Sequence, residues 1–214
     1  MKKSSVIFVL SILAFSALKS QDSSPVDTRQ KFQIGVKAGA NYANVYDESG
    51  DQFRADGKLG LALGGFVRIP ILKQIGIQPE ILYSQKGFKG SGTLLGNSYN
   101  FSRTTNYLDV PILFAFKPSP YVTFLGGPQF SYLLSQKDEF TSTLYSNSQM
   151  AEFNLDDIRN NLFGFALGID ANFENFLVSA RACWDVSNNH ADGTRTTPRY
   201  KNMWFQLTLG YRIY

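Results

Sequence analysis

Residues 32–42 of the chain read Phe-Gln-Ile-Gly-Val-Lys-Ala-Gly-Ala-Asn-Tyr, a stretch in which two kinds of side chain alternate. Phe32, Ile34 and Val36 open an apolar row that runs to Tyr42 at steps of two, while the positions between them are polar or glycine. Successive side chains of a β-strand point to opposite faces of a sheet. This period of two therefore predicts a strand with one apolar and one polar face.

The same alternation recurs along the chain and gives eight expected strands. They lie at residues 32–42, 59–69, 75–86, 108–116, 122–134, 163–170, 176–185 and 202–213. Pro79, Pro111 and Pro128 fall inside these segments, where proline cannot donate a ladder hydrogen bond, so we expect bulges or ladder irregularities there. Residues 154–160 are expected to form a helical turn within a loop.

The connections between the strands alternate between long and short. Long ones are expected at residues 47–58, 87–97, 137–160 and 187–199, and short ones at 73–74, 117–120 and 173–175. An up-and-down barrel with tight turns at one end and longer loops at the other requires this alternation. Eight strands of about 9–11 spanning residues use roughly 70–90 positions, whereas a 16-stranded porin would need about 160. We therefore expect an all-β fold, an eight-stranded antiparallel up-and-down transmembrane β-barrel.

The first 20 residues have the features of a secretory signal peptide. Lys2 and Lys3 precede an apolar stretch at 6–15, which is too short for a membrane-spanning helix of about 20 residues. We expect a signal peptide over 1–20, a short periplasmic segment over 21–31 and the barrel domain over 32–214. Without the leader, the net charge of +4 falls to 18 basic against 17 acidic residues, which gives no electrostatic case for binding nucleic acid.

Periodicity alone does not say which face of the barrel points inward, because a soluble lipocalin-like barrel would place its apolar face inside. Here the polar faces combine glycine with charges of both signs, which suits a narrow lumen where charges pair. Aromatic residues on the apolar face gather near the strand ends, as in the interfacial girdles of membrane barrels. They are Tyr42, Tyr83, Tyr132 and Trp184 toward the loops, and Phe114, Phe116 and Tyr211 toward the turns. The sequence therefore favours an apolar face that meets lipid.

The polar faces also bring a set of ionisable residues into the expected lumen. The set comprises Arg68, Glu80, Lys86, Asp109, Arg181 and Asp185. Buried charges are tolerated only when they are paired and hydrogen-bonded, so we expect a structural network of lumen charges in which basic residues such as Lys86 or Arg68 pair with Glu80. A proton or ion path along the same residues is the alternative interpretation.

Two residues bear on catalysis. His190 lies in the last long loop near Asp185 and Ser187, a combination that a lipid-modifying barrel enzyme could use for acyl transfer. An exposed loop histidine is the simpler interpretation. Cys183 is expected to point into the lumen as a packing residue.

Metal and phosphate motifs are not supported. Residues 47–58 begin like an EF-hand loop, but Gln52 replaces the required glycine and Lys58 occupies the place of the bidentate glutamate. Residues 60–65 are rich in glycine, but no helix follows them, which excludes a phosphate-binding loop. One Cys and one His in the whole chain exclude Cys-cluster and HExxH metal sites. We expect no enzyme activity, no cofactor and no metal.

Four segments resemble the PorT-like outer-membrane β-barrel family. They are Gly-Val-Lys-Ala-Gly-Ala-Asn at 35–41, Pro-Glu-Ile-Leu-Tyr-Ser-Gln-Lys-Gly at 79–87, Asn-Tyr-Leu-Asp-Val-Pro-Ile-Leu at 106–113 and Gly-Gly-Pro-Gln-Phe-Ser-Tyr-Leu-Leu at 126–134. The resemblance runs from about Phe32 to the C-terminus. It implies an outer-membrane barrel without catalytic residues, and the founding member of the family is linked to a secretion pathway for cell-surface proteins.

These expectations define a non-enzymatic surface or assembly module of the outer membrane, with both termini in the periplasm. Its expected partners are outer-membrane lipid and lipopolysaccharide, the barrel-assembly machinery and secretion-system components. An eight-stranded barrel enzyme that modifies outer-membrane lipid, by acyl transfer to lipid A or deacylation, is the alternative.

Overall fold

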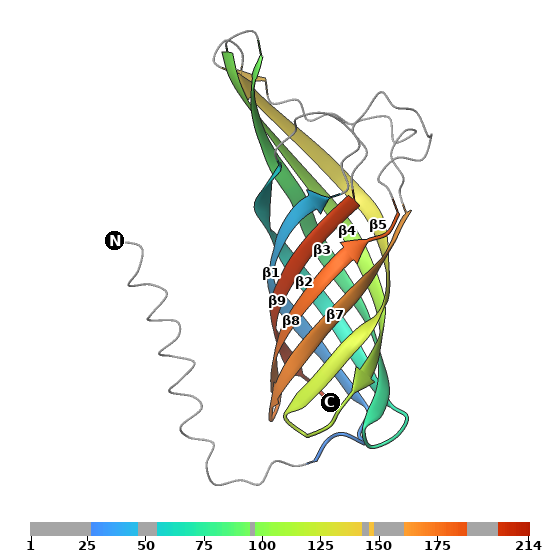
Figure 1. Cartoon of the computed structure of the whole chain (residues 1–214). Coiled ribbons are helices and arrows are strands. Elements are labelled where there is room, and N and C mark those ends of the chain that lie inside the picture. The colour runs from blue at the N-terminus through green and yellow to red at the C-terminus, as the bar shows by residue number, and fades with distance from the viewer. Residues whose placement is uncertain (1–26, 47–54, 95–96, 143–145, 148–160, 188–200) are drawn as a thin grey trace, which may run out of the picture.

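The computed structural model describes residues 27–46, 55–94, 97–142, 146–147, 161–187 and 201–214, and within them eight strands form one closed antiparallel barrel (Figure 1). The barrel strands are β1 (Gln33–Tyr46), β2 (Ala55–Pro70), β3 (Ile75–Leu94), β4 (Asn97–Phe116), β5 (Val122–Ser142), β7 (Asn161–Phe173), β8 (Phe176–Asp185) and β9 (Lys201–Arg212). The short strand β6 (Ser146–Asn147) pairs with Phe140 and Thr141 of β5.

Each barrel strand pairs with its neighbours in chain order, and β1 closes the barrel against β9. In the closing ladder Ala38 lies opposite Leu209, and Tyr42 lies opposite Phe205. A closed barrel leaves no strand edge with unpaired backbone groups, which is the condition for a sheet that crosses a bilayer. The expected eight-stranded up-and-down fold is confirmed.

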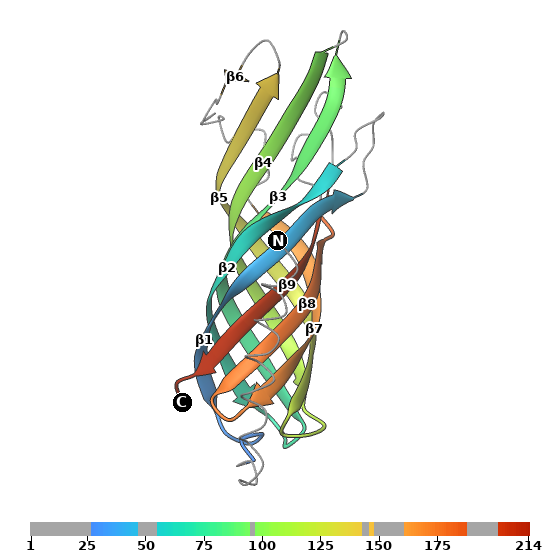
Figure 2. The ribbon, with the colours of Figure 1, turned by 90° about the vertical axis from the view of Figure 1, so that its left-hand side faces the viewer.

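The two ends of the barrel differ (Figure 2). We call the end with the short connections after β2, β4 and β7 the turn end, and the opposite end the loop end. The C-terminus lies at the turn end, where the Tyr214 carbonyl accepts a hydrogen bond from the Ile34 N–H at 3.0 Å. At this end the Lys117 ammonium also donates to the Arg29 carbonyl.

The expected signal peptide at 1–20 and most of the segment at 21–31 lie outside the described residues, as does the expected helical turn at 154–160. None of the residues that the structure describes forms a helix long and apolar enough to cross a membrane.

Burial in this barrel is the reverse of burial in a soluble protein. On the outer face Leu207 is 60% exposed and Phe205 is 58% exposed, whereas on the inner face Lys37 and Glu80 are 1% and 2% exposed. Most of the residues expected in the aromatic girdles also point outward and are exposed, namely Tyr42, Tyr132, Phe114, Phe116 and Tyr211. A lipocalin-like barrel with an apolar interior is therefore excluded.

The longest strands contradict the loop expected at 87–97. β3 and β4 continue through this segment and are separated only by residues 95–96, and β5 runs to Ser142, into the loop expected at 137–160. Beyond the apolar band of a membrane barrel, both faces of a strand can be polar, so the period-two signal ends although the strand does not. The connection between β3 and β4 is therefore not a long loop, so long and short connections do not alternate strictly. The strands β3, β4 and β5 are long instead.

The three strand prolines mark interruptions in the ladders, as expected. Pairing skips residues 67–68 opposite 78–79, 80–81 opposite 110–111, and 112–113 opposite 127–128, and each gap contains one of Pro79, Pro111 and Pro128. The register shifts lie elsewhere, between Gly57 and Ala62 and between Asn106 and Tyr107. The prolines therefore interrupt hydrogen bonding without changing the register.

Introducing a charged residue on the outer face tests whether this face contacts lipid or water. Leu207→Arg, near the middle of β9, should lower the free energy of unfolding in lipid vesicles by about 2–4 kcal/mol, because arginine is costly at the bilayer midplane. Ser91→Arg, on the exposed end of β3, is the control and should have little effect. Urea titration of both variants provides the measurement, and equal stabilities would contradict a lipid-facing surface at Leu207.

Candidate functional site in the barrel lumen

Glu80 on β3 is the centre of the charged lumen. Its carboxylate accepts hydrogen bonds from the Lys37 Nζ of β1, at 2.9 Å to Oε1 and 2.8 Å to Oε2. The Arg181 guanidinium of β8 donates to the same two oxygens at 2.6 and 2.7 Å. All three side chains are buried. Because β3 and β8 lie four strands apart in a barrel of eight, the bidentate Arg181–Glu80 pair spans the lumen.

Arg68 on β2 forms a second ion pair across the lumen. Its Nη2 donates to Asp170 Oδ2 of β7 at 2.9 Å, and its Nη1 donates to Asn172 Oδ1 at 3.2 Å. Gln78 joins the two clusters, because its Oε1 accepts from Arg68 Nε at 2.6 Å while its Nε2 donates to Glu80 Oε1 at 2.7 Å. One continuous polar network therefore joins the two clusters in the lumen.

The lumen also holds a further ion pair and an apolar cluster that runs from Ala43 and Trp204 toward the turn end at Ala115 and Leu125. Lys86 Nζ lies 3.0 Å from Asp109 Oδ1 and 3.6 Å from the centre of the Trp204 ring, a cation–π contact. Trp204 is 1% exposed and packs in a buried cluster with Ala43, Leu113, Ala115, Leu125, Ala166 and Cys183. Asp185 Oδ2 accepts from Asn202 Nδ2 at 2.7 Å.

Two glycines on the inner face provide the space that these large side chains need. An added Cβ at Gly168 would lie 2.6 Å from the Cγ of Arg181, and one at Gly35 would lie 2.6 Å from the ring of Phe66. Phe66 in turn packs against Lys37, whose Nζ is 5.5 Å from the ring centre. The glycines of the polar faces thus make the narrow lumen wide enough for its charges.

All six ionisable residues expected in the lumen are buried there, but their partners differ from the expected ones. Glu80 pairs with Lys37 and Arg181, rather than with Lys86 or Arg68. Arg68 and Lys86 have carboxylate partners of their own, Asp170 and Asp109. Lys37 and Asp170 were not part of the expected set, although both occupy polar-face positions. Sequence periodicity identifies which side chains share a lumen, but not which pairs meet across it.

The residues considered for catalysis do not form a site in the described part of the chain. His190 and the EF-hand-like acids at 47–51 lie outside the described residues. Cys183 is buried in the apolar cluster around Trp204, as a packing residue would be. Among the described residues, no group of three or more His, Cys, Asp or Glu side chains is placed to hold a metal ion.

A closed barrel with an apolar exterior and a charged, filled interior defines an integral membrane β-barrel. The chain belongs to the outer membrane protein beta-barrel domain family, whose model matches residues 19–191. It is therefore an outer-membrane β-barrel protein. A search of curated protein sequences found no match.

Solved structures with a similar course of the chain share little sequence with it. The attachment invasion locus protein Ail of Yersinia pestis is 18% identical, with a TM-score of 0.47 over 85% of this chain and 98% of Ail. OprG from Pseudomonas aeruginosa is 12% identical, with a TM-score of 0.43 over 88% of this chain and 99% of OprG. The outer membrane protease OmpT from Escherichia coli is 10% identical, with a TM-score of 0.37 over 85% and 95%.

The pairing in the lumen can be tested with a double-mutant cycle. Glu80→Gln should lower the free energy of unfolding by about 3–5 kcal/mol, because it leaves Lys37 and Arg181 buried without a counter-charge. Lys37→Met should be strongly non-additive with Glu80→Gln, whereas Lys86→Met should add to it within about 0.5 kcal/mol. Urea unfolding in lipid vesicles is the measurement.

Glu139→Gln is the matched control for this cycle. Glu139 pairs with Lys137 at 2.7 Å, but their side chains are 46% and 47% exposed. Such a pair contributes about 0–1 kcal/mol, so the control should remain close to the wild type. Coupling of Glu80 to Lys86 instead of Lys37 would refute the pairing described above.

Proposed function

We propose that the protein is a non-enzymatic outer-membrane barrel of the PorT-like kind that presents an interaction surface at its loop end. The observation that carries this proposal is the length of three adjacent strands. β3 and β4 have 20 residues each and β5 has 21, whereas β8 has 10 and β9 has 12. Since about 9–11 residues suffice to cross the membrane, roughly half of each long strand is available outside it.

The lumen network supports a structural role rather than catalysis or transport. The Glu80–Arg181 and Arg68–Asp170 pairs each join opposite sides of the barrel. Their charged groups bind one another, so few of them remain to bind a substrate or a permeating ion. We assign Arg68, Glu80, Lys86, Asp109, Arg181 and Asp185 to the stability of the barrel.

Barrels of this class have short periplasmic turns and longer extracellular loops, which supports an orientation with both termini in the periplasm. The barrel-assembly machinery would insert the chain, and the outer-leaflet lipopolysaccharide would surround the loop end. The resemblance to the PorT-like family supports a role in exporting proteins to the cell surface. Three of its four segments, at 79–87, 106–113 and 126–134, lie on β3, β4 and β5, the strands that extend beyond the barrel.

The orientation can be tested by labelling single cysteines in a Cys183→Ser background. Cysteine at Ser91 or Thr141, which are exposed at the loop end, should react with an impermeant maleimide on intact cells. Cysteine at Gln74 or Ser119, in the tight turns, should react only after the outer membrane is opened. Labelling of the turn residues on intact cells would reverse the proposed topology.

The proposed function can be tested by deleting the gene and measuring the proteins exported to the cell surface. The deletion strain should export fewer of them, and the wild-type gene should restore export. A shortened variant in which Asn-Gly replaces residues 90–101 keeps Lys89 opposite Ser102 across a two-residue turn. It should insert as a heat-modifiable barrel yet fail to restore export. An unchanged surface proteome after deletion would refute the link to secretion.

A further inference from the structure

The outward face of β3, β4 and β5 changes character in steps from the barrel toward the loop end. Tyr83, Leu108 and Tyr132 form one cross-strand row at the edge of the apolar band. The next row consists of Gln85, Asn106 and Ser135, whose side chains are joined by hydrogen bonds of 3.1 and 2.8 Å. This sequence of apolar, aromatic and amide rows is that of a surface passing from hydrocarbon into a polar interface.

The next two rows of the same face carry three lysines, and the second row also carries Asp56 and Glu139. Lys137 of β5 lies opposite Thr104 of β4. Lys58 of β2 reaches across to donate hydrogen bonds to Ser102 Oγ at 3.0 Å and to Thr104 Oγ1 at 2.5 Å. One row further on, Lys89 of β3 lies opposite Ser102, and Ser102 lies opposite Glu139. Three lysines and two hydroxyl groups thus occupy one continuous patch.

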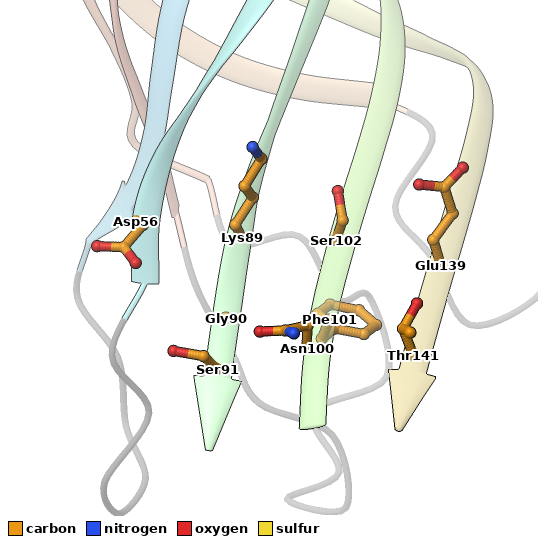
Figure 3. Close-up of a pocket in the computed structure, with 9 residues that line it drawn as sticks. All are labelled: Asp56, Lys89, Gly90, Ser91, Asn100, Phe101, Ser102, Glu139 and Thr141. Atoms are coloured by element: carbon orange, nitrogen blue, oxygen red, sulfur yellow. The ribbon is translucent and has the colours of Figure 1, made fainter. Parts of the chain in front are cut away.

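A pocket of about 460 Å³ lies over this face, and Figure 3 shows its lining. Lys89, Ser102 and Glu139 stand in a row on adjacent strands, and Ser91, Asn100 and Thr141 form the neighbouring row toward the strand ends. The lining is therefore a set of hydrogen-bonding side chains, with the ammonium of Lys89 and the carboxylates of Asp56 and Glu139 in the row that is nearer to the barrel.

The three lysines of the patch outnumber the two carboxylates beside them, Asp56 opposite Lys89 and Glu139 opposite Ser102. Only Lys137 forms an ion pair, with Glu139, whose pKa is lowered by that hydrogen bond. Among the described residues, Lys58 and Lys89 lack an ion-pair partner. Partial burial lowers the pKa of the Lys58 ammonium. The negative charge of Glu139 raises this pKa, whereas the positive charges of Lys89 and Lys137 lower it. The three lysines therefore repel one another, and an anion bound between them would relieve this repulsion.

The distance of the patch from the hydrocarbon of the membrane indicates which kind of anionic group could reach it. Lys89 is six residues beyond Tyr83 on β3, a distance of about 20 Å along the strand. Because the strands of such barrels tilt by 35–45°, this corresponds to about 15 Å along the membrane normal. The headgroup region of a phospholipid leaflet extends only about 5–8 Å beyond the hydrocarbon. The lysines thus lie above phospholipid headgroups, at the level of the phosphorylated sugars of lipopolysaccharide.

We propose that the patch formed by Lys58, Lys89, Lys137, Ser102 and Thr104 binds phosphate groups on the core sugars of the lipopolysaccharide that surrounds the barrel. Lysine ammonium groups bind phosphate as point charges, and the hydroxyl groups add hydrogen bonds. The neutral row of Ser91, Asn100 and Thr141 offers donors and acceptors to the sugar hydroxyls. In the cell, this inference rests on the proposed orientation, with the loop end outside.

The test compares two double variants of the folded mature protein in detergent. Lys58→Gln/Lys89→Gln removes the two lysines that lack ion-pair partners, and Lys31→Gln/Lys73→Gln removes two lysines near the turn end. Rough lipopolysaccharide with a phosphorylated core is titrated against each by thermophoresis. At about 1 kcal/mol per lysine, the first variant should bind about 30-fold more weakly than the wild type, and the second should be unchanged. Raising the salt concentration should weaken wild-type binding.

Two further probes identify the source of the phosphate. The same lipopolysaccharide after chemical removal of its phosphates, and phosphatidylglycerol, should both bind the wild type as weakly as the lysine variant binds the intact molecule. Equal affinity of wild type and Lys58→Gln/Lys89→Gln would overturn the proposal, as would full binding of either control lipid. Because this assay uses purified protein, its outcome is independent of the labelling and export experiments that test the proposed function.

Discussion

The carboxylate of Glu80 binds two cations that come from different sides of a narrow barrel, and the rest of the interior is arranged around this contact. Lys37 and Arg181 both reach it with short hydrogen bonds, and Gln78 extends it to Arg68 and Asp170. A buried charge is costly unless it is paired. The lumen of an eight-stranded barrel is only wide enough for side chains, so each charge must find its partner on another strand rather than in water.

This constraint explains the distribution of glycine and of bulky residues on the inner face. Gly168 leaves space for Arg181, and Gly35 leaves space for Phe66. On the outer face the requirement is reversed, because hydrocarbon replaces water as the solvent and leucine, phenylalanine and isoleucine become the favoured exposed residues. The same chain thus follows two opposite rules of burial, one on each face of every strand.

The fold could be predicted from the sequence because a two-residue period is a strong signal wherever one face meets lipid. The alternation located all eight barrel strands and assigned Arg68, Glu80, Lys86, Asp109, Arg181 and Asp185 to the inner face. The ends of β3, β4 and β5 could not be predicted in this way. Residues 87–91, 100–105 and 135–139 carry serine, threonine, asparagine and charged residues, so they resemble a loop in composition while they pair as strands.

The ion pairs of the lumen were also beyond sequence reasoning. Whether Glu80 meets Lys86, six residues away on its own strand, or Arg181, 101 residues away on β8, depends on strand tilt and register around the whole barrel. The patch on the outward face was missed for a related reason. Lys58 and Lys137 lie in segments that were interpreted as loops, and their relation to Ser102 and Glu139 exists only once the long strands are paired.

The long strands also set a direction for assembly. The part of β3, β4 and β5 beyond the barrel carries Lys89, Arg103, Lys137, Asp138 and Glu139. Each charge of this kind costs about 2.5–3.5 kcal/mol at the centre of a bilayer, so spontaneous passage of all five through hydrocarbon would meet a barrier above about 10 kcal/mol. The turn end carries its charges in short connections that need not cross. Once the extended sheet has passed through the membrane, the same barrier opposes its return, and the barrel is held in one orientation.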